Sequence, residues 1–171
     1  MMTDRYVVFS HGKDGEPWGN KIVAMAEVAR DKGYGIESMD YRGMDNPLDR
    51  VAHLLAQGGR INGSRVLVGS SLGGHVSAAA STALDARGLF LLAPAFYMPG
   101  FEQYTPKPAA CPITIVHGWR DDIVPVDNSV RFAREYRATL HVIDSDHRMA
   151  ANIADICHHF DYFLTRLETA V

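Results

Sequence analysis

Short, mostly apolar runs alternate along the chain with longer segments in which apolar residues recur every three or four positions. The short runs predict six strands, and four of them are apolar almost throughout, which is typical of strands covered on both faces. One run is more polar, because it contains Glu37 and Ser38, and we expect it at a sheet edge. The predicted strands are Tyr6–Phe9, Gly35–Asp40, Arg65–Val68, Leu89–Leu92, Ile113–Val116 and Leu140–Ile143.

The segments between these runs have the spacing of amphipathic helices. Asn46 followed by Pro47 is typical of a helix start, and Gly58 with Gly59 ends the same helix. The apolar positions of this helix predict one buried face, made of Leu48, Val51, Ala52 and Leu55. The other predicted helices are Asn20–Lys32, Leu72–Leu84, Val126–Arg137 and a last helix with the stripe Ile153, Ile156, Cys157, Phe160, Leu164 and Leu167.

The repeated alternation of strand and helix predicts an α/β fold. Parallel strands joined by helices require right-handed crossovers, which place helices on both faces of the sheet. We therefore expect a three-layer sandwich around a six-stranded, mostly parallel, doubly wound sheet. At roughly 150 residues per domain, the length favours a single domain over residues 1–171. The one irregular stretch, Ala95–Cys111, is interrupted by prolines and predicts a loop.

Composition narrows the class of protein further. The net charge is −3, so we expect neither nucleic acid nor an anionic membrane surface as a partner. No apolar run reaches the roughly 18–20 residues of a membrane span, and Met1–Arg5 shows no signal-peptide core, so we expect a cytoplasmic protein. Cys111 and Cys157 provide neither a disulfide framework nor a CxxC metal pair.

A GxSxG motif lies between the third predicted strand and an Ala-rich helix. In this position the motif is typical of a nucleophile elbow, a sharp turn that raises its serine, here Ser71, above the sheet. A tight turn without catalysis would also use glycine and serine. A dinucleotide-binding turn would need glycine at position 71 or 75, where the chain has Ser71 and His75. The motif in this context therefore predicts Ser71 as a nucleophile.

A serine hydroxyl becomes a strong nucleophile when a histidine accepts its proton and an acid orients that histidine. Asp121 and Asp122 follow the fifth predicted strand, and His147 follows the sixth. The carboxyl ends of parallel strands lie at one edge, so these residues share that edge with Ser71. Spacing favours Asp121 and His147 but leaves Asp122 open. The remaining candidate histidines are expected in structural or pocket-lining positions: His11, His75, His117, His141, His158 and His159.

Attack on a carbonyl creates an oxyanion that two backbone N–H groups can stabilise. The first would come from Leu72, directly after the nucleophile. The second would come from Lys13, in the loop after the first strand, where Gly12 permits a close approach. Four aromatic residues in neighbouring loops are candidates for lining a substrate pocket: Trp18, Phe96, Tyr97 and Trp119.

Taken together, these motifs resemble the α/β-hydrolase superfamily, in particular its small serine hydrolases without a lid. The similar segments are the oxyanion loop Ser10-His11-Gly12, the DxRG segment Asp40–Gly43, the elbow Gly69–Gly73, the acid loop His117–Pro125 and the histidine loop Asp146-His147. The HGxxDxxVP pattern of the acid loop implies that Asp121, and not Asp122, is the acid.

The resemblance implies a minimal α/β-hydrolase fold in which a short proline-rich loop stands where larger members carry a cap domain. It also implies a hydrolase without a cofactor or metal that cleaves a small-molecule ester or thioester by acyl transfer. An amidase or peptidase would use the same residues, and a binding protein without catalysis could keep the same fold. The sequence does not specify the natural substrate or the oligomeric state.

Overall fold

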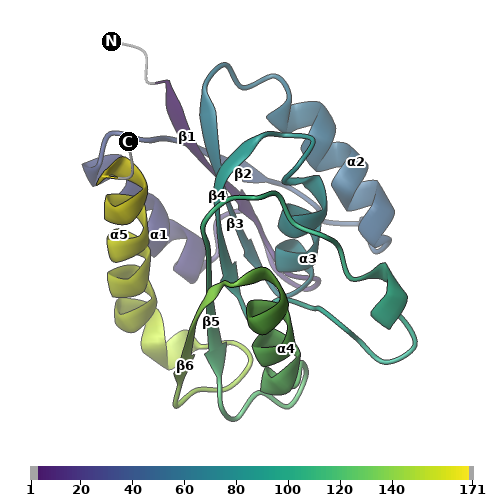
Figure 1. Cartoon of the computed structure of the whole chain (residues 1–171). Helices are drawn as coiled ribbons and strands as arrows, with labels where there is room; N and C mark the ends of the chain where they lie inside the picture. The colour runs from purple at the N-terminus through teal and green to yellow at the C-terminus, as the bar shows by residue number, and fades with distance from the viewer. Residues whose placement is uncertain (1–3, 170–171) are drawn as a thin grey trace.

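The computed structural model describes residues 4–169, which form one parallel sheet between two layers of helices (Figure 1). The six strands lie in the order β2-β1-β3-β4-β5-β6, and every neighbouring pair is parallel. The more polar strand β2 lies at an edge, as its sequence predicts. The strands are β1 (Arg5–Ser10), β2 (Gly35–Met39), β3 (Ser64–Ser70), β4 (Ala86–Leu92), β5 (Ile113–Gly118) and β6 (Thr139–Ile143).

Helices cover both faces of the sheet, so the predicted three-layer, doubly wound architecture is confirmed (Figure 1). Helices α1 (Asn20–Asp31) and α5 (Ile153–Thr169) pack on one face, around a core that includes Phe90 and Phe160. The opposite face carries α2 (Pro47–Gly58), α3 (Leu72–Ala80) and α4 (Val126–Tyr136). No helix within residues 4–169 is long and apolar enough to cross a membrane. Residues 1–3, part of the start in which we expect no signal peptide, lie outside the described residues.

The strand order places two loops side by side where the candidate chemistry is expected. β1 and β3 are neighbours, but the chain leaves β1 toward α1 on one face and leaves β3 toward α3 on the other. Such a switch point opens a crevice at the carboxyl ends of the strands, which is the usual ligand site in doubly wound sheets. The β1–α1 loop, Gly12 included, therefore lies beside Ser71.

Two details differ from the expected helices. The buried face predicted for α2 is confirmed only in part. Val51 and Leu55 pack against the core, but Leu48 is 75% exposed and Ala52 is exposed. Arg50 and Leu54 are the buried residues instead. The reason is that the Arg50 guanidinium finds backbone carbonyl partners inside the protein. Helix α3 ends at Ala80 instead of Leu84, because the chain turns there and the Ser81 hydroxyl donates to the carbonyl of Ala78.

The proline-rich segment between β4 and β5 has little regular structure, as expected. Its one regular element is a single 3₁₀ turn, Glu102–Tyr104. A second 3₁₀ turn, Ala150–Asn152, leads into α5. Neither turn forms a layer above the sheet, so the described residues contain no helical cap in this position.

Candidate active site

Ser71 lies in a strained turn at the junction of β3 and α3. Its φ of 53° and ψ of −117° are unusual for a residue with a side chain, and such strain concentrates at functional sites. The surrounding glycines permit the turn: a Cβ at Gly69 would overlap the carbonyl oxygen of Gly73, and a Cβ at Gly73 would overlap that of Ser10. The N–H of Ser71 donates to the carbonyl of Leu92, 2.8 Å away, which anchors the turn to β4.

The structure brings Ser71, His147 and Asp121 into one chain of hydrogen bonds. Nε2 of His147 lies 3.1 Å from Oγ of Ser71. Nδ1 of the same ring lies 2.7 Å from Oδ2 of Asp121. A carboxylate only accepts, so Nδ1 carries the proton and Nε2 offers its lone pair to the Ser71 hydroxyl. This is the tautomer that a general base at Ser71 requires.

Asp121 is the buried end of this chain, and its side chain is 0% exposed. Its second oxygen, Oδ1, accepts hydrogen bonds from the N–H groups of Val124 (2.8 Å) and Ile123 (2.9 Å). Burial by itself would raise the pKa of Asp121, but the hydrogen bonds from His147 and from these two N–H groups outweigh it and lower the pKa. The group therefore stays a carboxylate. Asp122 is exposed.

The loop that carries His147 is stabilised by a hydrogen bond within the loop and by another from α1. Oδ1 of Asp146 accepts a hydrogen bond from the N–H of Met149, 2.9 Å away, and Met149 is fully buried with a positive φ of 51°. Nζ of Lys21, on α1, donates to the carbonyl of Arg148 at 2.6 Å. The sequence motifs do not indicate this role of Lys21, because Lys21 and Arg148 are 127 positions apart in the chain.

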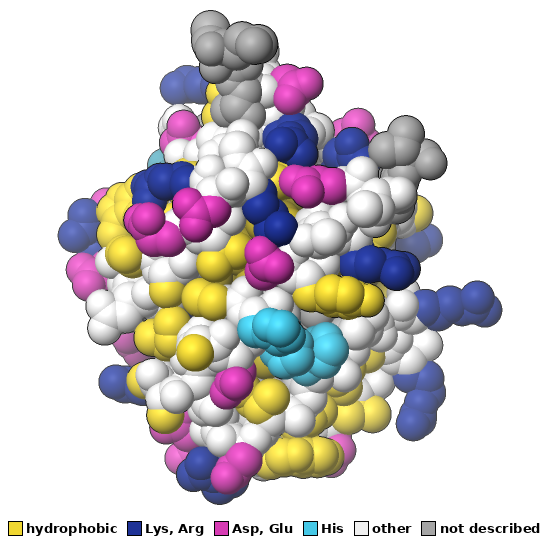
Figure 2. Space-filling view, turned by 90° about the vertical axis from the view of Figure 1, so that its left-hand side faces the viewer, with side chains coloured by type: hydrophobic (Ala, Val, Ile, Leu, Met, Phe, Trp, Pro, Cys, Tyr) yellow, Lys and Arg dark blue, Asp and Glu magenta, His cyan; other side chains and the backbone are white. Residues whose placement is uncertain are grey.

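Four of the histidines expected in structural or pocket-lining positions make structural contacts. His11 is buried, and its Nε2 accepts a hydrogen bond from the N–H of Tyr41 at 2.9 Å. His117 is also buried and contacts Asp121 directly. Histidine side chains gather on the side of the molecule shown in Figure 2. The rings of His141 and His159 stack with their centroids 3.9 Å apart.

The two expected oxyanion donors have free backbone N–H groups on either side of the elbow. Leu72 is the first residue of α3, so its N–H has no partner within the helix. Lys13 donates no backbone hydrogen bond among those of the described residues. The loop of Lys13 touches the elbow, because a Cβ at Gly12 would lie 3.5 Å from Cβ of Ser71. The assignment of both donors remains a prediction.

The candidate pocket residues divide into three groups. Trp18 and Trp119 are 47% and 63% exposed and are free to contact a ligand. Phe96 was predicted wrongly as a pocket residue: it is 0% exposed and stacks on Phe132, with ring centroids 4.0 Å apart, because its side chain completes the core under α4. Tyr97 is half-buried and donates to Glu135 at 3.0 Å; burial and this hydrogen bond raise its pKa to about 12.

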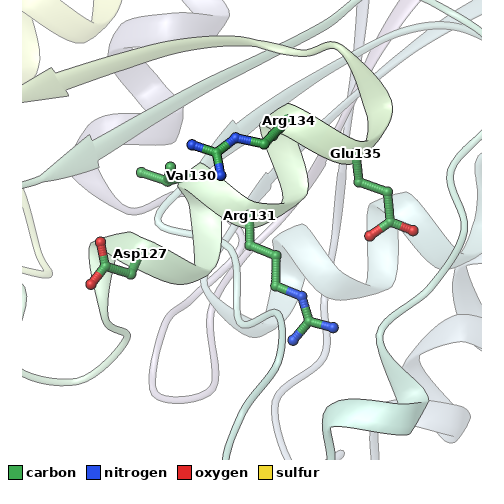
Figure 3. Close-up of a pocket in the computed structure, with 5 residues that line it drawn as sticks. All are labelled: Asp127, Val130, Arg131, Arg134 and Glu135. Atoms are coloured by element: carbon green, nitrogen blue, oxygen red, sulfur yellow. The ribbon is translucent and has the colours of Figure 1, made fainter.

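A pocket along α4 includes none of the candidate site residues (Figure 3). It is lined by Asp127, Val130, Arg131, Arg134 and Glu135, all of them on α4. None of these is a candidate catalytic residue. Among residues 4–169, no group of three or more His, Cys, Asp or Glu side chains is placed to hold a metal ion.

Comparison with known proteins agrees with this fold. The model of the α/β hydrolase family matches residues 7–170, so the chain belongs to the α/β hydrolase family. A structure from Xanthomonas campestris pv. campestris, assigned to the α/β superfamily of hydrolases, is 30% identical with a TM-score of 0.88. The match covers 94% of this chain and 98% of that one.

Two further proteins are similar to this chain. A serine hydrolase without a lid from Xanthomonas campestris has the same fold, with 20% identity, a TM-score of 0.73 and coverage of 100% of this chain and 85% of that one. The mitochondrial palmitoyl-protein thioesterase ABHD10 of Bos taurus is 38% identical over 74 residues, which is 40% of this chain. The match spans only 24% of that relative's length.

Proposed function

We propose that this chain is a serine hydrolase that cleaves small esters or thioesters by acyl transfer through Ser71, His147 and Asp121. The observation that carries the proposal is the unbroken hydrogen-bond chain from Oγ of Ser71 through both ring nitrogens of His147 to Oδ2 of Asp121. The same three side chains lie on the strained elbow and on the loops after β5 and β6, where a ligand would enter.

In the proposed first half-reaction, Oγ of Ser71 attacks the carbonyl carbon while its proton passes to Nε2 of His147. The carbonyl oxygen becomes an oxyanion, which the N–H groups of Leu72 and Lys13 would stabilise. His147 then gives its proton to the leaving alcohol or thiol as the carbon–oxygen or carbon–sulfur bond breaks. Asp121 keeps the imidazole in the required tautomer and stabilises its charged form.

In the second half-reaction, water takes the place of the leaving group. His147 accepts a proton from this water, and the resulting hydroxide attacks the acyl-Ser71 ester. The carbon–Oγ bond breaks, Oγ recovers the proton from His147, and the carboxylic acid leaves. No cofactor takes part in these reaction steps. We propose Trp18, Tyr97 and Trp119 as the side chains that contact the substrate.

Hydrolysis of p-nitrophenyl butyrate and of a short-chain acyl thioester tests the proposal. Ser71→Ala should lose turnover of both, by up to about 10⁶-fold in kcat, while Ser70→Ala, altered at the adjacent serine, should retain it. Undiminished hydrolysis by Ser71→Ala would contradict the proposal. Absence of hydrolysis by the wild-type protein, together with tight ligand binding, would instead indicate a binding protein with this fold.

A further inference from the structure

Arg50 on α2 is a fully buried cation, only 1% exposed. Its guanidinium is satisfied by backbone carbonyl groups and not by an acid. None of the ion pairs among the described residues includes it. The acceptors are the carbonyl oxygens of Met44 (2.7 Å from Nε), His11 (3.1 Å from Nη1), Gly12 (3.2 Å from Nη1) and Lys13 (3.2 Å from Nη2).

An unpaired buried charge is unfavourable for folding unless its hydrogen bonds are complete. Arginine keeps its charge in proteins and cannot escape this penalty by losing a proton. Three of its four acceptors belong to consecutive residues of one loop, the loop after β1 that faces the elbow. The hydrogen bonds of Arg50 therefore hold the backbone of the β1–α1 loop in one conformation.

The carbonyl directions determine where the N–H groups of the loop point. In a trans peptide the C=O and the N–H of the next residue lie in one plane and point in opposite directions across the C–N bond. The described residues contain no cis peptide. The carbonyl of Gly12 points to Arg50, so the N–H of Lys13, in the same peptide unit, points away from it. The N–H groups of Gly12 and Asp14 are turned away in the same manner, because the carbonyls of His11 and Lys13 also face the guanidinium.

Two further donors, besides Arg50, hold the Gly12–Lys13 peptide in this orientation. Nε2 of His11 accepts from the N–H of Tyr41, so Nδ1 carries the ring proton and donates it to the carbonyl of Gly12 at 2.7 Å. The N–H of Gly15 donates to the same oxygen at 3.3 Å. The Gly12–Lys13 peptide is thus held by His11 and Gly15 in addition to Arg50, and its N–H side is left free.

We propose that Arg50 is a positioning residue for hydrolysis, which aims the N–H of Lys13 at the oxyanion by holding the carbonyls of His11, Gly12 and Lys13. The inference rests on the proposed function, since an oxyanion forms only if Ser71 attacks a carbonyl. Arg50 does not itself touch the substrate. An oxyanion donor acts in the transition state. A change in the orientation of the Lys13 N–H should therefore lower kcat and leave KM little changed.

The chain offers a matched control in Arg65 at the other end of β3. Its guanidinium also donates to three backbone carbonyls, those of Gly58, Ile61 and Leu84. Arg65 lies six residues before Ser71, about 20 Å along an extended strand. Arg50→Met and Arg65→Met should therefore both lower Tm, but only Arg50→Met should impair the chemistry.

The experiment measures Tm, kcat and KM for the wild type, Arg50→Met, Arg50→Lys and Arg65→Met, with kcat expressed per site titrated by a fluorophosphonate. We expect Arg50→Met to lose about 10²-fold in kcat, similar to the loss of one oxyanion donor. Arg50→Lys, which can still reach some of the carbonyls, should lose less. Arg65→Met should keep the wild-type kcat.

A second measurement needs no Arg50 variant and covers the case in which Arg50→Met does not fold. When a phosphonate is attached to Ser71 of the wild-type protein, the amide proton of Lys13 should shift downfield in the NMR spectrum. An unshifted Lys13 amide, or an Arg50→Met variant with a lower Tm but unchanged kcat, would overturn this inference and leave the proposed function standing. Absence of fluorophosphonate labelling in the wild type would overturn the proposed function and this inference with it.

Discussion

His117 and His147 contact the same carboxylate oxygen. Nε2 of His117 lies 2.9 Å and Nδ1 of His147 lies 2.7 Å from Oδ2 of Asp121. Nε2 of His117 also lies 2.9 Å from the carbonyl of Val124, which can only accept, so this nitrogen carries a proton. Burial lowers the pKa of His117 and keeps its ring neutral. The neutral His117 ring thus packs against Asp121 and is bonded to Val124, whose N–H donates to the same carboxylate.

This arrangement predicts that a hydrogen-bond donor at position 117 is needed for full activity. His117→Phe leaves the buried Val124 carbonyl and Ser129 hydroxyl without this partner and should lower the free energy of unfolding by about 1–3 kcal/mol. Without the ring that packs against it, the carboxylate of Asp121 should shift and misplace His147, which should lower kcat by up to about 10²-fold. His117→Gln keeps an N–H donor and should lose less of both. Chemical denaturation and steady-state kinetics compare the two variants; equal kcat values would contradict the role of the donor.

Asp121 and Asp122 provide a second matched pair. Asp121→Asn removes the carboxylate that selects the His147 tautomer, and the equivalent change in a serine protease lowers kcat by about 10⁴-fold. We expect a loss of this order. Asp122→Asn alters an exposed side chain and should leave kcat within about twofold of the wild type, in line with the small effects of surface substitutions. Steady-state kinetics on one ester compare the kcat values of the two variants. The opposite ranking would assign the acid role to Asp122.

The stacked rings of His141 and His159 predict a loss of stability in acid. Burial lowers the pKa of both below the ordinary value of 6.5, and the neighbouring histidines lower that of His159 further. Between the lowered pKa and 6.5 the unfolded chain binds more protons, so this contribution to stability is complete above pH 6.5 and decreases as the pH falls. His159→Gln should flatten the dependence of Tm on pH between 7 and 5. His53→Gln, outside the stack, should leave it unchanged, and equal slopes for all three proteins would contradict the prediction.

The short β4–β5 segment predicts the response to acyl-chain length. Phe96 belongs to the core, and Phe101 and Tyr104 are 65% and 64% exposed, so the segment cannot enclose a long chain. Each methylene that stays in water forgoes roughly 0.8 kcal/mol of burial. Across p-nitrophenyl esters from acetate to palmitate, kcat/KM should rise and then level off, without activation above the critical micelle concentration. A steady rise to palmitate would show that a longer hydrophobic surface takes part.

The sequence was sufficient for the parts of the fold that depend on local patterning. Apolar runs and helix-terminal residues predicted all six strands and the five helices of the described chain. The motifs at the strand ends indicated Ser71, Asp121 and His147, and parallel strands bring such positions together whatever the intervening sequence.

Residues whose position depends on long-range contacts could not be predicted in this way. Phe96 follows a strand end and looks like a pocket residue, but only the packed structure shows Phe132 beneath it. The apolar pattern of α2 gives no indication that Arg50 is buried, because charged side chains normally remain exposed. Its burial depends on the carbonyls of a loop 37 to 39 positions earlier in the chain. The spacing of Arg50, Leu54 and Gly58 on one stripe of α2 was the one available signal.

The central claim is that Ser71 is the activated nucleophile, and mapping of the residue modified by a fluorophosphonate tests it most directly. The reagent reacts with serine hydroxyls that a neighbouring base activates, and Ser71 has Nε2 of His147 at 3.1 Å. Peptide mass spectrometry of the labelled protein should find the adduct on Ser71 alone, and His147→Gln should abolish it. An adduct on Ser70, or labelling that persists in full in His147→Gln, would contradict the account.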